Sequence, residues 1–181
     1  FVSNDVARIL LAKVYMYQQK WAAASGLLQQ VVDKNIYSME KVPTKYTSEN
    51  KDLILALKLG NNGSRASRVY VDGSPEEVVP IMTTTDVMLL YAECEIHLGN
   101  NAKASKYISE VGNINGISGT NVSVKGIKQL RKSLKLQDYF AFLKRNGLAM
   151  KELGLEKYQL LLPIPQNEIN MNPNMTQNPG Y

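Results

Sequence analysis

The stretch that decides the fold is residues 160–181 at the C-terminal end, which reads LLLPIPQNEINMNPNMTQNPGY. Its four prolines fix φ and lack amide donors, so this segment is not expected to form a helix or a central strand. The same segment is too apolar for a solvated linker. Its apolar side chains are Leu161, Leu162, Ile164, Ile169, Met171 and Met175. We therefore predict an irregular but ordered C-terminal strap over residues 160–181, laid against a preformed surface.

Two segments upstream carry the pattern of helical hairpins, at about residues 4–35 and 83–113. In the first, cap-type residues precede an apolar run whose spacing follows one helical face. That face is expected to carry Val6, Ile9, Leu10, Val14 and Tyr17. The second begins with Thr83-Thr84-Thr85-Asp86, a capping sequence, and has a break at Gly99, which suits a left-handed C-terminal position. The short joins predict that each helix pair is antiparallel.

The two hairpins match each other when one is shifted by eighty residues. Small and larger apolar residues then coincide in four pairs: Ala12 with Ala92, Ala24 with Ala104, Leu28 with Ile108, and Val31 with Val111. Alanine at a helix crossing lets two backbones approach closely, and this is the tetratricopeptide-like pattern. Two such repeats are too few for a self-supporting solenoid. The strap is therefore expected to cover an exposed end of the stack.

The remaining segments complete a mainly α fold. Residues 52–59 form a short apolar run that is either a strand or a helix fragment, and its brevity and flanking turn residues favour an extended element. Residues 125–154 are expected to form a further helix pair, with Gly147 as a weak point and Gly154 as a terminator. We predict one domain over residues 1–181, built from tetratricopeptide-like hairpins, a short extended element and the strap.

The strap also carries a family resemblance. Its separately spaced elements are Pro163-Ile164-Pro165, Glu168-Ile169, Asn172-Pro173 and Gln177-Asn178-Pro179-Gly180-Tyr181. In this order they resemble the ending of SusD/RagB family proteins, which are nutrient-binding lipoproteins of the outer membrane. The resemblance covers residues 4–35, 83–113 and 125–181. The chain resembles either the C-terminal portion of a family member or a shortened family member.

The resemblance implies a SusD-like fold and a non-catalytic role in capturing a nutrient, in the first place an oligosaccharide. It implies a SusC-like TonB-dependent transporter as partner, a location at the outer membrane surface, and a lipid anchor in an N-terminal region outside this chain. The family usually has glutamates near Arg131 and Leu134, whereas this chain has Lys132, Lys135 and Gln137 in that neighbourhood. Partner contacts built on those carboxylates are therefore not carried over.

Composition argues against several other classes of function. No run approaches the roughly eighteen apolar residues that a membrane helix needs. The formal net charge is +5, but the basic residues are spread and few aromatic residues stand among them, so nucleic-acid binding is not expected. The single histidine, His97, and the single cysteine, Cys94, do not form a recognisable catalytic or zinc-binding set. We expect no catalytic residue, no metal and no cofactor.

Five residues in expected loops are the candidates for a ligand-binding rim. They are Tyr37, Tyr46, Arg65, Arg68 and Tyr70. Tyrosine rings stack under sugar rings, and planar polar side chains bridge hydroxyl groups, so this mixture suits a glycan. The alternative, also open from the sequence, is a tetratricopeptide-like scaffold that binds other proteins and takes no small-molecule ligand.

Overall fold

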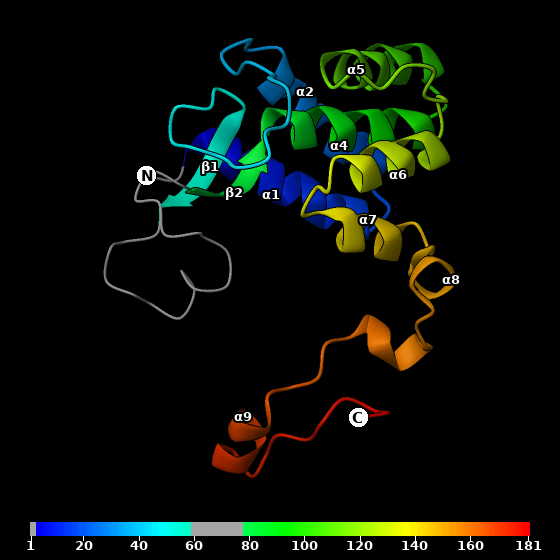
Figure 1. Ribbon diagram of the computed structural model, residues 1–181. Helices are drawn as coiled ribbons and strands as arrows, with labels where there is room; N and C mark the ends of the chain where they lie inside the picture. The colour runs from blue at the N-terminus through cyan, green and yellow to red at the C-terminus, as the bar shows by residue number, and fades with distance from the viewer. Residues whose placement is uncertain (1–2, 59–77) are drawn as a thin grey trace. The chain divides into compact units, whose positions relative to one another are not determined.

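The first helical hairpin forms where its sequence pattern predicts it, as α1 (Asn4–Tyr17) and α2 (Trp21–Val32). The computed structural model describes residues 3–58 and 78–181, and it divides at Gln137 into two compact units (Figure 1). Ser3 caps α1, because its hydroxyl accepts a hydrogen bond from the backbone N–H of Val6 at 3.3 Å. The chain reverses through Gln19, whose φ of 58° is left-handed.

The second hairpin is α4 (Thr84–His97) and α5 (Asn101–Ile114), with Gly99 at φ 80° between them. α2 packs against α4, so the two hairpins form a continuous stack. The eight residues matched by the eighty-residue shift are buried, each at most 2% exposed. This confirms the tetratricopeptide-like prediction at the level of packing, since the alanines lie where paired helices meet.

The face of α1 that points into the stack differs from the expected one. Val6 and Ile9 are buried, but Leu10, Val14 and Tyr17 are about half exposed. The buried face continues instead through Ala12 and Met16. α1 therefore carries two apolar stripes, and the buried one is the stripe that contains Ala12.

The apolar run after Asp52 is a strand, β1 (Leu53–Lys58), as its flanking residues favoured. It pairs antiparallel with β2 (Val78–Thr83), with Leu53 opposite Thr83 and Lys58 opposite Val78. β2 leads directly into α4 (Figure 1). The sequence did not reveal β2, because it contains Pro80, which the ladder of a two-stranded sheet tolerates since each strand is an edge.

The last element of the first unit is α6 (Val124–Ser133), which packs against α4 and α5. Ser123 caps it, and its hydroxyl accepts from the N–H of Gly126 at 3.2 Å. A Cβ at Gly126 would lie 1.8 Å from the carbonyl oxygen of Asn121, so only glycine permits this approach. Residues 134–137 then leave α6 through Lys135 at φ 51°.

The second unit begins with two short helices, α7 (Tyr139–Arg145) and α8 (Ala149–Leu153). Gly147 at φ 68° separates them, and Gly154 at φ 65° ends α8. Both glycines act at the positions that the sequence assigned to a weak point and a terminator. The prediction that residues 1–181 form one domain stays a prediction.

The strap includes a 3-10 helix, η1 (Lys157–Leu160), at its start and a short α-helix, α9 (Gln166–Met171), within it. The expectation that no helix forms in residues 160–181 was therefore wrong. Pro165 stands at the cap of α9 and not inside it, so its missing N–H and fixed φ do not oppose the helix.

The strap is held in shape by its own hydrogen bonds. The side chain of Gln177 accepts from the N–H of Ile164 at 2.8 Å and donates to its carbonyl at 2.9 Å. The hydroxyl of Tyr181 donates to the carbonyl of Leu161 at 2.8 Å. The apolar side chains of Leu162 and Met171 are 78% and 84% exposed. The strap thus has hydrogen bonds of its own, as an ordered segment requires, and both its order and its expected role of covering the helical stack stay predictions.

Within residues 3–58 and 78–181, none of the helices has the length and apolar character needed to cross a membrane.

Candidate functional site

A pocket of about 530 Å³ opens beside the start of α4 in the first unit. Its lining comes from residues 42–46, from residues 78–80 of β2, from Thr83 and Asp86, and from residues 133–137 after α6. We call it the α4 pocket. Three segments far apart in the sequence meet there, which is how ligand sites are commonly assembled on a rigid scaffold.

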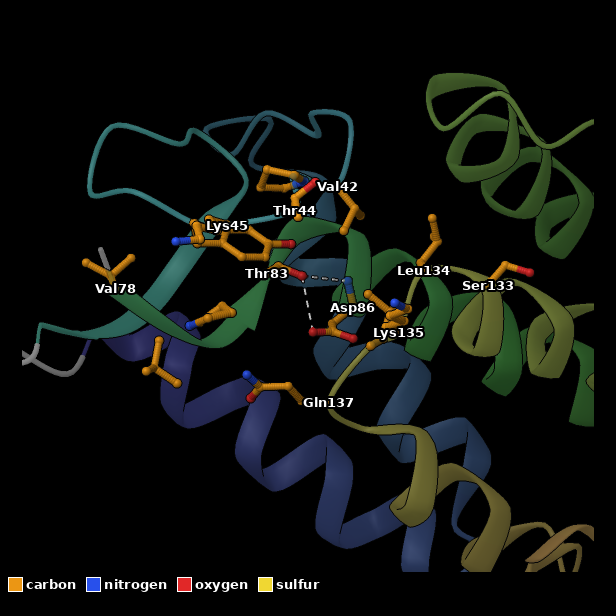
Figure 2. A pocket seen from close by; sticks show the side chains of 15 residues that line it. Val42, Thr44, Lys45, Val78, Thr83, Asp86, Ser133, Leu134, Lys135 and Gln137 are labelled. Carbon is orange, nitrogen blue, oxygen red and sulfur yellow. Dashed lines mark hydrogen bonds between the residues drawn. The ribbon is translucent and has the colours of Figure 1, made fainter. Parts of the chain in front are cut away.

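The polar floor of the α4 pocket is the capped N-terminus of α4. Thr83 is the cap, and its hydroxyl accepts from the backbone N–H of Asp86 at 3.1 Å. The same hydroxyl donates to Oδ2 of Asp86 at 3.1 Å (Figure 2). An acidic residue in the first turn also interacts favourably with the helix dipole. The carboxylate of Asp86 is therefore held in a fixed position at the pocket.

A buried arginine supports this carboxylate from the other side. Nη1 of Arg131, on α6, lies 3.4 Å from Oδ1 of Asp86, and the Arg131 side chain is 0% exposed. A buried ion pair of this kind fixes geometry more than it adds stability, because both groups lose their hydration. It ties α6 to the start of α4.

A second carboxylate, that of Asp52, lies buried at the base of the β-hairpin. Its Oδ1 accepts from the backbone N–H of Thr85 at 3.0 Å and from the Thr85 hydroxyl at 3.1 Å. Its backbone carbonyl accepts from the N–H of Thr84 at 2.7 Å. Among the described residues, its Oδ2 has no hydrogen-bond partner. These contacts clamp the beginning of β1 to the first turn of α4.

Burial, with a smaller contribution from the negative charges of Asp86 and Glu40, raises the pKa of Asp52 to about 6. The hydrogen bonds from Thr85 act in the opposite direction, because they stabilise the charged form. Asp52 is consequently a carboxylate whose protonation changes in mildly acidic solution.

Tyr46 is the aromatic residue of the α4 pocket lining. Burial raises its pKa above the ordinary value, and the charges of Asp52 and Asp86 raise it further. The hydroxyl of Tyr46 is therefore protonated throughout the physiological range and can donate a hydrogen bond.

The labelled side chains in Figure 2 show the polar floor lying between two sides of the pocket. Val42 and Thr44 lie on one side of Thr83 and Asp86, and Gln137 lies on the other. Lys135 and Gln137 are exposed residues of the lining, whereas Thr83 is only 2% exposed. The pocket thus combines hydroxyl, amide and carboxylate groups with an apolar wall from β2.

The five residues expected to form a binding rim fall in three places. Arg65, Arg68 and Tyr70 lie outside the described residues. Tyr46 lines the α4 pocket. Tyr37 lines a separate cavity of about 20 Å³. The role of all five in ligand binding stays a prediction.

Tyr37 has a structural partner in Asp5 on α1. Its hydroxyl donates to Oδ2 of Asp5 at 3.1 Å, and Lys34 Nζ lies 2.6 Å from Oδ1 of the same carboxylate. Burial raises the pKa of Asp5, but the hydrogen bonds from Lys34, Tyr37 and Arg8 outweigh it and lower the pKa overall. This cluster fastens the chain after α2 to α1.

Sequence reasoning missed most of the α4 pocket. The sequence predicts Thr83 and Asp86 only as a helix cap, which they are. It marks Lys135 and Gln137 only as departures from the family pattern. No local signal places residues 133–137 beside Tyr46, because the two segments meet only through the packing of α6 on α4.

His97 and Cys94, the single histidine and the single cysteine, both take part in packing. His97 stacks on Trp21 with ring centroids 3.8 Å apart and an interplanar angle of 6°. Trp21 thus joins the start of α2 to the end of α4, and it also packs against the hydrophobic core that α1 and α2 share. Cys94 is buried, as expected for a small apolar residue. In the described part of the chain, no group of three or more His, Cys, Asp or Glu side chains could hold a metal ion.

The SusD family model matches residues 7–131 and 120–181, which together span nearly the whole chain. This chain belongs to the SusD family. The resemblance of the strap is thereby confirmed, and so is the mainly helical SusD-like fold. No curated protein matches this SusD-family chain.

Two solved structures share the fold of this SusD-family chain. A SusD superfamily protein from Bacteroides thetaiotaomicron VPI-5482 has a TM-score of 0.75 at 16% identity. Surface glycan-binding protein A from Bacteroides uniformis has a TM-score of 0.66 at 15% identity. Each comparison covers 98% of this chain and 61% of the other. The chain thus spans somewhat less than two thirds of these structural relatives.

Proposed function

We propose that this chain is the scaffold portion of a non-catalytic protein that captures a nutrient glycan at the cell surface. The observation that carries the proposal is the family match over residues 7–131 and 120–181, which includes both hairpins and the strap. One structural relative is named as a surface glycan-binding protein. The function of this chain is inferred from that kinship and from the chemistry of its own site.

The α4 pocket supports the proposal independently of the kinship. Glycan recognition uses apolar surface against the C–H face of a sugar ring and fixed polar groups for its hydroxyls. The α4 pocket offers both, with Val79 and Pro80 on β2 and with Thr83, Asp86 and Gln137. Its volume of about 530 Å³ is within the usual range of small-molecule sites.

The proposed cellular setting is an uptake complex in the outer membrane. The protein would be tethered to the outer surface by an N-terminal lipid anchor outside this chain. It would hold its glycan over the pore of a SusC-like TonB-dependent transporter. Family membership supports this setting, and a gene for a large TonB-dependent transporter beside the gene for this chain would support it further.

The direct test of glycan capture is binding by the purified chain. Calorimetry and retardation in polysaccharide-containing native gels, each against a panel of glycans, should give heat and retardation with at least one glycan. A chain that gives neither with any member of the panel would contradict the proposal. Buffer-matched bovine serum albumin provides the control for nonspecific retardation.

The second candidate function is that of a protein-binding scaffold without a small-molecule ligand. The exposed apolar stripe of α1 favours it, with Leu10, Leu11, Val14 and Tyr17 between 43% and 51% exposed. Surfaces of this kind on helical repeats commonly bind protein. Co-purification with a transporter fits both candidates, so the glycan panel is the experiment that separates them.

A further inference from the structure

We propose that the exposed apolar face of α1 is the docking surface for one more helix, which packs on α1 as α2 packs on α4. The docking helix is the second helix of a further tetratricopeptide-like hairpin, which precedes α1 in the same polypeptide. The face consists of Ala7, Leu10, Leu11 and Val14, and we call it the α1 stripe. The inference does not depend on glycan binding, because it concerns the helical stack and not the α4 pocket.

The α1 stripe is a continuous apolar surface on one side of a helix. Its residues follow the spacing i, i+3, i+4 and i+7, which places them next to one another. All four are exposed, with Leu10 at 51%, Leu11 at 43% and Val14 at 50%. Apolar side chains gathered in this way, unlike single ones, mark contact with another polypeptide segment.

The repeat in the sequence shows what becomes of the same stripe in the second hairpin. Under the shift of eighty residues, the α1 stripe corresponds to four residues of α4. They are Val87, Leu90, Tyr91 and Cys94. Each of these four is at most 2% exposed. The two helices thus carry an apolar stripe at the same repeat positions, and it is covered in α4 but not in α1.

The helix α2 lies against the stripe of α4. It packs against α4, and the four stripe residues of α4 share one hydrophobic cluster with Ala24 and Leu28 of α2. Polar and aromatic contacts join the same two helices. Oγ of Ser25 donates to Oε1 of Glu95 at 2.5 Å, and Trp21 stacks on the ring at the end of α4. The stripe of α4 is therefore buried by the second helix of the preceding hairpin.

The order of the stack identifies the occupant of the α1 stripe. In α4, this face is covered by a helix from the hairpin that comes earlier in the chain. The equivalent face of α1 therefore suits the second helix of a hairpin that comes before α1. The repeat places neither a second copy of this chain nor an unrelated protein in that register. Both structural relatives also have chain beyond the matched part, since each comparison covers 61% of the relative.

The residues of α1 define the chemistry of the docking helix. Tyr15 stands where α4 has Glu95, so the docking helix needs no hydroxyl donor at the position of Ser25. Tyr17 stands where α4 has the ring that stacks on Trp21, so an aromatic residue is expected at the start of the docking helix. The partner is thus an amphipathic helix that is more apolar than α2 on its contact face.

The test measures how far a thiol in the α1 stripe is shielded. Val14→Cys places a cysteine at the repeat position of Cys94, which is buried and serves as the internal reference. Residues 1–181 are compared with the complete polypeptide that the gene encodes, each at two protein concentrations. Labelling with a maleimide is followed by peptide mass spectrometry. Each rate is divided by the rate of the same cysteine in urea, which removes differences in intrinsic reactivity.

We expect the new thiol in residues 1–181 to react within about tenfold of its rate in urea, because the α1 stripe is open there. In the complete polypeptide it should react at least about a hundredfold more slowly, as a thiol that reacts only after local opening does. Gln29→Cys is the control. Gln29 and its repeat equivalent, Ser109, are both exposed, so its labelling should differ less than twofold between the two proteins.

A second variant guards against a local disturbance at residue 14. Leu11→Cys lies one turn away on the same stripe, at the repeat position of the buried Tyr91. It should show the same shielding as Val14→Cys in the complete polypeptide. Melting curves of both variants check that each remains folded at the labelling temperature.

The other outcomes contradict the proposal and name a different occupant. Equally fast labelling in both proteins means that no helix of the polypeptide covers the α1 stripe. Slow labelling in residues 1–181 that becomes fast on dilution means that a second copy covers it. Slow labelling there at both concentrations means that the stripe is already covered within residues 1–181. Shielding of the complete polypeptide only when another protein co-purifies assigns the stripe to that protein, and a gene that encodes nothing ahead of Phe1 also overturns the proposal.

Discussion

Asp52 is the residue whose surroundings most clearly determine a measurable property. It is 0% exposed, and its Oδ1 takes both hydrogen bonds from Thr85 while its Oδ2 has no partner among the described residues. Burial without a countercharge favours the protonated carboxyl, which is why its pKa is raised to about 6. The folded state is thus most stable when Asp52 is neutral, although the hydrogen bonds from Thr85 favour the charged form.

The direction of the pH dependence follows from the raised pKa. The folded state binds the Asp52 proton more tightly than the unfolded state, whose pKa is near 3.8. The stabilisation is therefore complete below about pH 4 and is lost as the pH rises through about 6. A shift of this size corresponds to roughly 3 kcal/mol at most. Asp52→Asn should remove this dependence, so it should be more stable than the wild type at neutral pH.

Urea unfolding of the wild type and of Asp52→Asn, at several values between about pH 4 and pH 7.5, measures this effect. The difference in free energy of unfolding should grow with pH across the window. Asp33→Asn, at an exposed position after α2, is the control and should show no comparable trend. A difference between wild type and Asp52→Asn that stays constant with pH would contradict the prediction.

At the scale of single elements, α1 and α2 show how far a local pattern carries. The caps and the alanines at crossings are local signals, and they place both hairpins correctly. The choice between the two apolar stripes of α1 is not local, because it depends on which stripe meets α2. β2 was not predicted because Pro80 argues against a strand, and only its edge position, which the local sequence does not show, makes that proline acceptable. α9 was not predicted because a proline inside a helix breaks it, whereas Pro165 stands at the helix start.

Matched leucine truncations test the assignment of the two faces. Leu28 on α2 is 0% exposed, and Leu10 on α1 is 51% exposed. Leu28→Ala leaves a cavity in the core and should lower the free energy of unfolding by about 2–5 kcal/mol. Leu10→Ala should cost less than about 1 kcal/mol. Equal losses, measured by chemical denaturation, would show that the second stripe of α1 is covered in the folded protein.

The strap depends on a glycine near its end. Gly180 has φ 100°, and a Cβ there would lie 2.5 Å from Cγ of Tyr158, whose ring meets that of Tyr181 edge to face. Gly180→Ala should therefore open the contact between the C-terminal residues and residues 158–164. Backbone strain of this kind costs about 1–3 kcal/mol. We expect the amide of Ile164, which donates to Gln177, to exchange at least about tenfold faster.

Hydrogen exchange read by NMR measures this opening. Gly26→Ala on α2 is the control, because nothing lies within 4 Å of the Cβ that it would add. Unchanged exchange at Ile164 in Gly180→Ala would mean that the strap does not need its C-terminal closure. Removing residues 161–181 tests the wider prediction that the strap stabilises the helical stack. If it does, the truncated chain should melt at a lower temperature than the full chain.

At the scale of the whole molecule, the fold followed from the sequence more readily than the site did. The sequence motifs that indicate the family lie within one continuous segment, residues 163–181, so the sequence alone is enough to recognise them. The α4 pocket joins residues 42–46, residues 78–80 with Thr83 and Asp86, and residues 133–137. Nothing in any one of these segments reveals the other two. The sequence does predict that Thr83 and Asp86 cap the start of α4. It does not predict that the same hydroxyl and carboxylate groups also face a pocket.

The net charge of +5 gives the last prediction, which concerns nucleic acid. The arginines of the most basic stretch are not available to phosphates. Arg131 is fully buried beside Asp86, and Arg145, 2% exposed, pairs with Asp138 at 3.1 Å. Over residues 3–58 and 78–181, the basic charge that remains at the surface is carried by scattered lysines and by Arg8, which pairs with Asp5. Such isolated charges make weak and strongly screened contacts.

We therefore expect only salt-sensitive, nonspecific association with a fluorescein-labelled DNA duplex. Fluorescence anisotropy should show binding, if any, at about 20 mM salt and none at about 150 mM with micromolar protein, because few counterions are released. A lysine-rich peptide of the same net charge serves as the reference. Submicromolar affinity that persists at the higher salt would contradict this reading, since it requires a contiguous basic surface that the buried arginines do not supply.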